Sequence, residues 1–442
     1  MLKKIGGSDD EIGASVNILE ADFPTPFISG LEYSAPARGT WNIVHTGFLL
    51  PEAHEIFVCA EGCLRGVVLT AAEMGASERF STISVCENNV LDGDMEDLII
   101  CGVSDILAKL PYRPKAVLVY TSCIHHFIGC DLPLVYKRLR EKFRDIDFAD
   151  CYMNPIMRKS GLTPDMIMRT RLYSLLKESP KDKKSINIIG NDFVTDKNSE
   201  LIKIITENGF TLREIQNCKT YSEYQGMAKG LINITYQPAA KPAGEALERR
   251  LSQKHLYLPL SFDYNEIIMG YNFLCDELKI ERYSFSRDIK NCEAALDKLK
   301  KTIGETPVAI DYTATFKPLG LALLLIKHGI NVKRVYADSF FDEEKAAFSE
   351  LQKILPDLKI ISTANVKMRF SKRITKEKYL AIGQKAAYFT GSNNFVNIVE
   401  CGGYYGFAGI QKMCDLMIDA YKTEKDARAL IGIKGMGCGC TL

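Results

Sequence analysis

The sequence lacks any long hydrophobic run, any excess of charge of one sign and, apart from one residue, tryptophan. Its 442 residues contain no window of 18 uncharged apolar residues, and the most apolar stretch, 319–329, has the length of a buried helix. The N-terminus has two lysines but no apolar segment of a secretory signal. With 56 basic and 55 acidic residues, no net field attracts nucleic acid or an anionic membrane. These absences predict a soluble, cytoplasmic protein that binds neither nucleic acid nor membranes.

Several common catalytic and metal-binding motifs are also missing. There is no G-x-x-x-x-G-K-[ST] loop for ATP, no G-x-S-x-G nucleophile motif and no H-E-x-x-H zinc motif. The paired CxxC sequences of a zinc ribbon and the cysteine run of a ferredoxin do not occur either. The sequence therefore offers no common motif for ATP binding, acyl transfer or a zinc site.

Cysteine, in contrast, is abundant, with fourteen residues in the chain. Disulfides are rare in a reducing compartment, so metal binding or thiol chemistry is one explanation. The alternative is that most of these cysteines are small buried hydrophobic residues. Both explanations remain open from composition alone.

Short apolar runs alternate with amphipathic helical stretches along most of the chain. Buried strands separated by helices are typical of parallel sheets built from βαβ units. The pattern predicts an α/β protein of three doubly wound Rossmann-like domains, with parallel sheets around a central cleft. Ligands are expected beyond the carboxyl ends of the strands. The expected strands are 115–123, 185–192, 255–260, 307–312, 332–338, 358–363 and 386–392, and the expected helices include 132–143, 199–210, 264–278, 292–305 and 319–329.

Two polar breaks, at 177–185 and around 290–306, each come directly before a new strand. They predict an N-terminal α/β domain of residues 1–180, joined by a C-terminal helix at 404–442. A second α/β domain is expected over 181–300 and a third over 301–403.

Three cysteines share one local context, because each follows an apolar run and comes directly before a turn. Cys59 follows "HEIFV", Cys86 follows "FSTISV" and Cys123 follows "KAVLVYTS". The carboxyl ends of parallel strands meet at one edge of a sheet, so three thiolates from distant sequence could meet there. Spacing alone leaves an iron–sulfur site and ordinary buried cysteines as alternatives.

The sequence resembles the nitrogenase component 1 family, which includes the molybdenum–iron protein subunits, cofactor scaffold proteins and reductases of tetrapyrrole biosynthesis. The resemblance is carried by "CAEGCLRGVV", "SVCENNVLDGDMEDL", "VLVYTSCIHHFIGCD" and the late "GGYYGFAG", and it extends over nearly the whole chain.

The resemblance implies that Cys59, Cys86 and Cys123 are the metal ligands that this chain contributes to an iron–sulfur cluster at a subunit interface. The cluster would contain four or eight irons and would be completed by a homologous component 1 subunit, in a homo- or hetero-oligomer. Its electrons would come from a separate ATP-hydrolysing iron protein. Cys63 and Cys130 are second choices as ligands, and His125 and His126 could donate protons or simply cap a helix.

The chain departs from nitrogenase proper at the cofactor site. The resemblance implies one anchoring cysteine near Thr235 and Tyr236 and one anchoring histidine within 392–403, yet neither residue stands there. A nitrogenase cofactor held in the usual way is therefore not expected. Tyr236 and Cys401 are the candidate cofactor-binding residues that remain, with core packing as the alternative for Cys401.

Two functions follow from the resemblance. The first is a reductase subunit that passes electrons from the cluster to a substrate, such as a tetrapyrrole, or to a second metallocofactor in the cleft. The second is a non-enzymatic scaffold on which an iron–sulfur cofactor is assembled, since weak anchoring would suit a cargo that must be released. A metal-free α/β binding protein is the third and least specific alternative.

Overall fold

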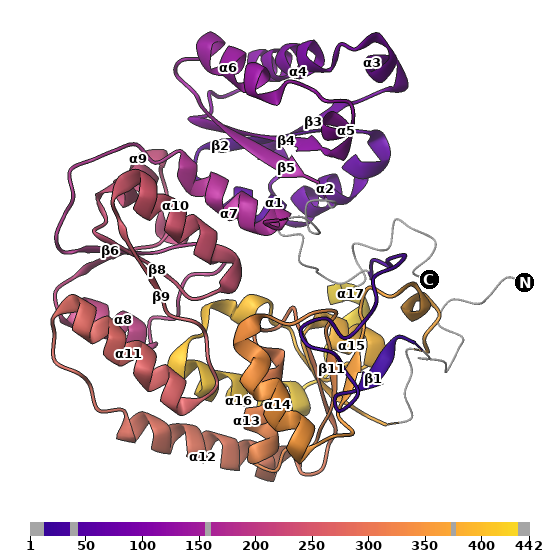
Figure 1. Cartoon of the computed structure of the whole chain (residues 1–442), viewed down its shortest axis with the longest axis vertical. Coiled ribbons are helices and arrows are strands. Elements are labelled where there is room, and N and C mark those ends of the chain that lie inside the picture. The colour runs from indigo at the N-terminus through magenta and orange to yellow at the C-terminus, as the bar shows by residue number, and fades with distance from the viewer. Residues whose placement is uncertain (1–12, 36–42, 155–160, 373–376, 432–442) are drawn as a thin grey trace, which may run out of the picture. The chain divides into compact units, whose positions relative to one another are not determined.

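The structure, a computed structural model, describes residues 13–35, 43–154, 161–372 and 377–431 (Figure 1). The chain forms two compact units. Unit 2 comprises Thr40–Val194 and Gly209–Tyr257, and unit 1 comprises Met1–Gly39, Thr195–Asn208 and Leu258–Leu442. Each unit is described by itself.

Unit 2 contains two parallel sheets of four strands. The first has the order β3-β2-β4-β5, with β2 at Ala53–Cys59, β3 at Phe80–Ser84, β4 at Ala116–Ser122 and β5 at Asp147–Met153. Every residue of β2 and of β4 is buried, which explains why both segments read as nearly continuous apolar runs. Helices α4 and α6 cover one face of this sheet, and α1, α2 and α7 cover the other (Figure 1).

The second sheet of unit 2 has the order β7-β6-β8-β9 and is parallel throughout. Its strands are short: β6 at Ser185–Ile188, β7 at Thr211–Arg213, β8 at Ile232–Thr235 and β9 at Lys254–Tyr257.

Unit 1 contains a six-stranded sheet with the order β1-β12-β11-β10-β13-β14. Strand β1 pairs antiparallel with β12, and the remaining pairs are parallel. An N-terminal strand thus joins the sheet of the last third of the chain, which local sequence patterns do not reveal. The bounds are β1 Ser15–Asn17, β10 Val308–Asp311, β11 Val332–Tyr336, β12 Lys359–Ile361, β13 Leu380–Ile382 and β14 Phe395–Val396.

The helices fill the connections between the strands. In unit 2 they are α1 Ile43–Gly47, α2 Glu61–Glu73, α3 Glu87–Asp92, α4 Met95–Lys109, α5 Cys123–Phe127, α6 Leu132–Lys142, α7 Pro164–Ser174, α9 Tyr221–Gln225 and α10 Lys241–Leu251. In unit 1 they are α8 Glu200–Glu207, α11 Tyr264–Leu278, α12 Ser286–Ile303, α13 Pro318–Lys327, α14 Lys345–Ile354, α15 Gln384–Thr390, α16 Gly406–Lys422 and α17 Ala427–Ile431.

The α/β class with three parallel or mainly parallel sheets is confirmed, as are the expected strands that became β4, β6 and β9 to β12. The division into three domains and the central cleft remain predictions, and residues 432–442 of the expected C-terminal helix lie outside the described residues. No helix among the described residues has the length and apolar character needed to cross a membrane.

The strand expected at 386–392 is wrong, because this segment forms most of α15. The true strand, β13, lies just before it and was missed. The backbone N–H of Ala386 donates to the buried Asp311 carboxylate at 2.7 Å, and the ring of Phe389 stacks on Tyr336 with centroids 5.5 Å apart. These tertiary contacts stabilise a helix in a segment whose aromatic residues favour a strand locally.

Candidate functional site

The three cysteines at the ends of apolar runs all lie at the carboxyl edge of the first sheet, which we call the thiol edge. Cys59 is the last residue of β2, Cys86 stands two residues beyond β3, and Cys123 directly follows β4. Strand β2 pairs in parallel with both β3 and β4, so the three strands end on the same side of the sheet. The thiol edge is thus assembled from three segments that are far apart in sequence.

Cys59 is the most buried thiol of this edge, with 1% of its surface exposed. Burial raises the pKa of its thiol to about 12, and the neighbouring thiols of Cys63 and Cys123 add to the increase. At neutral pH Cys59 is therefore protonated in the metal-free protein. A metal that binds there has to displace this proton, since the thiolate is the ligand.

Cys63 lies within electrostatic range of Cys59, although sequence reasoning ranked it only as a second choice. It occupies the first turn of α2, and its backbone N–H donates to the carbonyl of Ala60 at 2.9 Å. Its side chain is exposed at the start of the thirteen-residue helix α2. The missed signal is the spacing itself: Cys63 stands four residues after Cys59, the last residue of β2, which is about one helical turn.

Cys86 is exposed and sits in the turn that precedes α3. Its backbone N–H donates to the side-chain oxygen of Asn89 at 2.9 Å, which holds the start of α3. The N–H of Val85 donates to the carbonyl of Cys59 at 3.1 Å. The backbone just before Cys86 is therefore tied to the end of β2, but Cys86 is not among the thiols that shift the pKa of Cys59.

Cys123 is the first residue of α5 and is half-buried. The histidine two residues later, His125, is fully buried, and its Nδ1 lies 3.2 Å from the backbone nitrogen of Ser122. Burial lowers the pKa of His125, so the ring is neutral. Its role as a packed residue at the start of α5 is supported by this geometry.

Cys130 contacts a different group. Burial raises the pKa of its thiol to about 12, and the charge of Glu96 raises it further. The Glu96 carboxylate also accepts the backbone N–H of Asp131 at 2.7 Å, which places it beside the start of α6. Cys130 thus pairs with a carboxylate and not with the other thiols.

Within the described residues, no group of three or more His, Cys, Asp or Glu side chains is arranged to hold a single metal ion. The thiol edge therefore does not resemble a mononuclear site such as a zinc centre. Its donors are soft thiols from separate strands, and this donor set suits iron–sulfur clusters.

Cys401, the candidate in unit 1, is 2% exposed and lies in the turn Glu400–Gly403, with a left-handed φ of 60°. Burial raises its pKa to about 12, while hydrogen bonds from the Thr315 hydroxyl and the Phe316 N–H to the sulfur partly offset this effect. The cavity beside Cys401 has a volume of about 10 Å³, which suits one water molecule. The assignment of Cys401 as a cofactor-binding residue remains a prediction.

Tyr236 directly follows β8 in unit 2 and is 2% exposed. It belongs to a different compact unit from Cys401, and each residue is packed within its own unit. The suggestion that the two residues bind one cofactor remains a prediction.

The comparisons with known proteins agree with this fold. The family model for the nitrogenase component 1 type oxidoreductase matches residues 51–422. The chain belongs to the nitrogenase component 1 family. A search of curated proteins finds no match. Family membership supports an oxidoreductase, and the component 1 family typically binds iron–sulfur clusters.

Two solved structures of a component 1 protein share the fold. The structure described as nitrogenase Cp1 at pH 6.5 has 13% sequence identity and a TM-score of 0.63, covering 89% of this chain and 94% of that chain. The structure described as nitrogenase Cp1 at pH 5 also has 13% identity, with a TM-score of 0.58 and coverage of 92% and 94%. At this identity the likeness establishes the fold alone.

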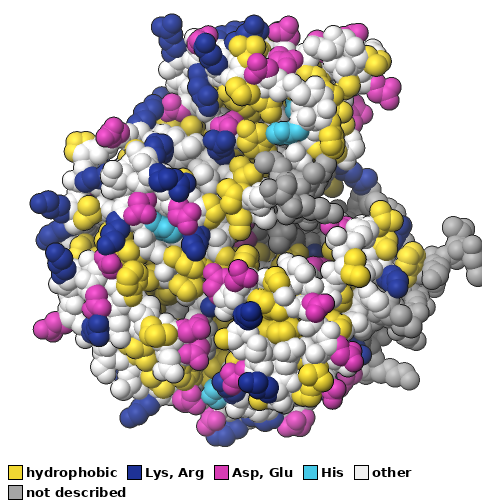
Figure 2. Space-filling model, viewed as in Figure 1, with side chains coloured by type: hydrophobic (Ala, Val, Ile, Leu, Met, Phe, Trp, Pro, Cys, Tyr) yellow, Lys and Arg dark blue, Asp and Glu magenta, His cyan; other side chains and the backbone are white. Residues whose placement is uncertain are grey.

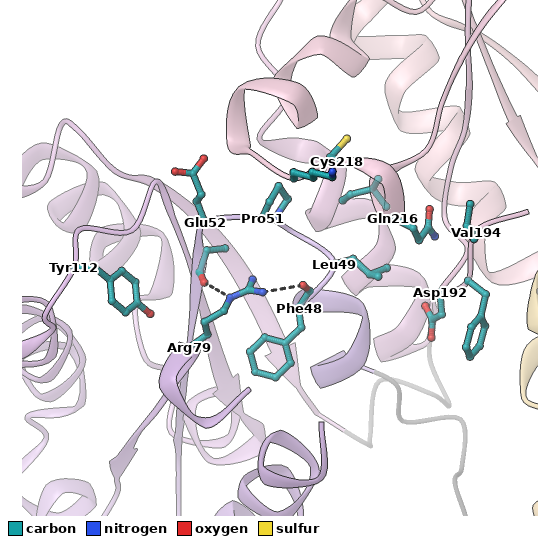
Figure 3. Close-up of a pocket in the computed structure, with 14 residues that line it drawn as sticks. Phe48, Leu49, Pro51, Glu52, Arg79, Tyr112, Asp192, Val194, Gln216 and Cys218 are labelled. Carbon is teal, nitrogen blue, oxygen red and sulfur yellow. Dashed lines mark hydrogen bonds between the residues drawn. The ribbon is translucent and has the colours of Figure 1, made fainter. Parts of the chain in front are cut away.

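Sequence reasoning also missed two features of unit 2. One is Glu55, a carboxyl group in the middle of buried β2 that is 1% exposed. The other is a cavity near Arg79 at the opposite edge of the sheet (Figure 3). An acidic residue inside the run "HEIFV" was the only available signal for the first, and no local pattern indicates the second.

Proposed function

We propose that this chain is a subunit of a nitrogenase-like reductase that receives electrons at an interface iron–sulfur cluster. Cys59, Cys86 and Cys123 would supply its thiolates, and electrons would pass to a substrate or second metallocofactor. The observation that carries the proposal is the occurrence, in a component 1 chain, of a cysteine at the end of each of three neighbouring parallel strands.

A cluster, when bound, would supply one-electron redox chemistry. Each cysteine of a cluster binds its own iron, so the thiols do not need to converge on one ion. The lack of a single-ion site among the described residues is compatible with this arrangement. Four or eight irons would both suit three ligands from one chain if a homologous subunit supplies the remaining ligands.

The chain's own residues would prepare the site in two ways. Cys59 is a protonated, buried thiol that must release its proton when the ligand bond forms. Cys63, an exposed thiol in the first turn of α2, would be an alternative ligand beside Cys59. Neutral His125 packs below Cys123 and adds no charge to the site.

Exposed apolar side chains near the thiol edge support a subunit interface there. Leu91 of α3 is 80% exposed and Phe127 of α5 is 70% exposed, which is unusual for large hydrophobic residues in a monomer. Figure 2 shows hydrophobic side chains at the surface over α3 and α5. Gly62 and Gly66 on the open side of α2 have no atom within 4 Å of an added Cβ, which leaves room for a second chain. We propose a homologous component 1 subunit as the partner on this face.

The energy source would be a separate ATP-hydrolysing iron protein, because the chain has no P-loop. The cytoplasmic localisation of this chain remains a prediction. The assembly scaffold is the second candidate function. The sulfur of Cys401 accepts hydrogen bonds within unit 1, so it would anchor a cofactor weakly, and weak anchoring suits a scaffold that must release its cargo.

The test is anaerobic purification of the full complex, followed by iron and sulfide analysis and EPR. The Cys86→Ala and Cys123→Ala variants should each lose most of the cluster signal, while Cys414→Ala, a buried cysteine of α16, should keep it. Unchanged iron in both thiol-edge variants would disprove the ligand assignment. Substrate turnover with an iron protein and ATP would identify a reductase, whereas cluster transfer without turnover would identify a scaffold.

A further inference from the structure

A cavity of about 540 Å³ lies within unit 2, at the amino edge of the first sheet (Figure 3). Glu52 and Ala53 at the start of β2, and Arg79 just before β3, form one side, and residues 215–219 form part of the other. Strand β2 runs from this cavity to Cys59, and six residues of extended chain span roughly 20 Å. The cavity is therefore separate from the thiol edge.

The guanidinium of Arg79 is a half-buried cation without an acidic partner among the described residues. It donates to the backbone carbonyls of Ala53 at 3.0 Å, Phe48 at 3.3 Å and Leu50 at 2.5 Å, and it forms no ion pair with a described residue. A guanidinium has five N–H donors, so two are left after these three bonds. The buried Glu55 raises the pKa of Arg79, but burial raises the pKa of Glu55 itself well above its usual value and so disfavours its charged form.

A second cation, the exposed Lys219, lines the cavity from the other side and likewise forms no ion pair among the described residues. Two acids also line the cavity, but each already has a partner. The Glu52 carboxylate accepts the backbone N–H of Tyr221 at 2.7 Å and points away from Arg79 (Figure 3), and Asp192 pairs with buried Arg169 at 2.8 Å. The backbone N–H leaves the charge of Glu52 in place, so the two cations Arg79 and Lys219 share the lining with one acid that is not paired with a cation among the described residues.

The remaining surface near these cations is apolar. The ring of Phe48 lies under the Arg79 guanidinium at 5.3 Å, and Leu49 and Ile215 continue the surface. We propose that this cavity binds a small organic anion, whose carboxylate or phosphate meets Arg79 and Lys219 while its apolar body lies on Phe48, Leu49 and Ile215. The volume matches cavities that hold molecules of this size, and paired cations favour carboxylate and phosphate groups.

The test uses three probes of matched shape on the purified full chain: 1-naphthoate, 1-naphthyl phosphate and 1-naphthylmethylamine. Ligand-observed NMR titration should show that at least one anion binds about tenfold or more tightly than the amine. Comparison of the two anions distinguishes a carboxylate ligand from a phosphate ligand. Equal affinity for the anions and the amine would overturn the proposal.

Two variants locate the binding. Lys219→Glu should lower the affinity for the anion about five- to tenfold, because it replaces electrostatic attraction by repulsion at the cavity wall. Lys229→Glu makes the same charge change on an exposed lysine outside the cavity lining and should have no effect. Equal loss in both variants would show that binding is only nonspecific charge attraction, which contradicts the proposal.

Leu49→Trp provides a test that leaves Arg79 and its loop contacts in place. The larger side chain should fill the apolar part of the cavity and abolish binding of the anions, with circular dichroism to confirm an unchanged fold. Retained binding would place the ligand elsewhere and overturn the proposal. Because binding of the anion does not involve iron, the result of this test is independent of the cluster assignment.

Discussion

Cys59 in unit 2 and Cys401 in unit 1 are almost equally buried, and burial raises the pKa of both thiols to about 12. Their surroundings are nevertheless opposite. The sulfur of Cys401 receives hydrogen bonds from the Thr315 hydroxyl and the Phe316 N–H, whereas Cys59 has the thiols of Cys63 and Cys123 as electrostatic neighbours. Burial and pKa therefore do not distinguish the proposed metal ligand Cys59 from Cys401, but the neighbouring groups do.

Two buried acids, Glu55 in unit 2 and Glu344 in unit 1, also differ in their neighbouring groups. Neither carboxyl oxygen of Glu55 in unit 2 has a hydrogen-bond partner among the described residues. In unit 1, Glu344 accepts the N–H groups of Leu319 at 2.7 Å and Gly320 at 3.1 Å, at the start of α13. One carboxyl oxygen of Glu344 thus has two backbone donors, whereas both carboxyl oxygens of Glu55 are without a hydrogen-bond partner among the described residues.

The strongest test of this contrast is iron content after removal of each sulfur. Cys59→Ala should reduce the iron of the anaerobically purified complex to near background, because a thiolate ligand is lost. Cys401→Ala should leave the iron unchanged, since that sulfur is already hydrogen-bonded within unit 1. Iron loss in the Cys401 variant would show that the hydrogen-bonded sulfur is a ligand after all.

The two acids should respond with opposite sign when each is replaced by methionine. Glu55→Met removes an unpartnered buried carboxyl and should raise the free energy of unfolding by about 1–3 kcal/mol at pH 8. Glu344→Met leaves two N–H groups without an acceptor and should lower it by about 1–3 kcal/mol at pH 5. Urea titrations at both pH values measure these changes.

The stability of the chain should depend on pH with a defined sign. Burial raises the pKa of Glu55 and Glu344, the latter to about 8, so their contribution to stability is fully present below the unfolded pKa near 4.5. It is lost as the pH rises towards the folded pKa. The wild-type chain should therefore lose stability between pH 5 and pH 8, and each methionine variant should lose less.

The smallest expected effect concerns the backbone at Cys401. Its φ of 60° is left-handed, which costs a residue with a side chain roughly 1 kcal/mol relative to glycine. Cys401→Gly should therefore be about 1 kcal/mol more stable than Cys401→Ala, although both lose the sulfur. Thermal unfolding of the two variants gives this difference directly, and an alanine variant as stable as the glycine variant would indicate a relaxed turn.

Local patterns were most informative where a segment is buried on both faces. The runs that became β4 and β10 are apolar, short and followed by turns, so their strand character did not depend on neighbours. The strand prediction for 386–392 was wrong because this segment depends on its neighbours. The hydrogen bond of Ala386 to Asp311 and the stacking of Phe389 outweigh its local preference for a strand.

At the candidate site, alternation of strands and helices was enough to expect Cys59, Cys86 and Cys123 at one edge of a parallel sheet. That expectation follows from chain direction alone, since parallel strands end on the same side. The proximity of Cys63 to Cys59 needed the first turn of α2, and the charges around the Arg79 cavity come from segments more than 130 residues apart.

The amino-acid sequence by itself determined the α/β class, several of the strands and the position of a thiol at each of three strand ends, because these depend on short-range periodicity. Only the tertiary structure decided which thiols share an environment, which buried carboxyl oxygens lack a partner and where two cations line one cavity. Such properties arise from desolvation and from contacts between distant segments, and no local window of sequence contains them.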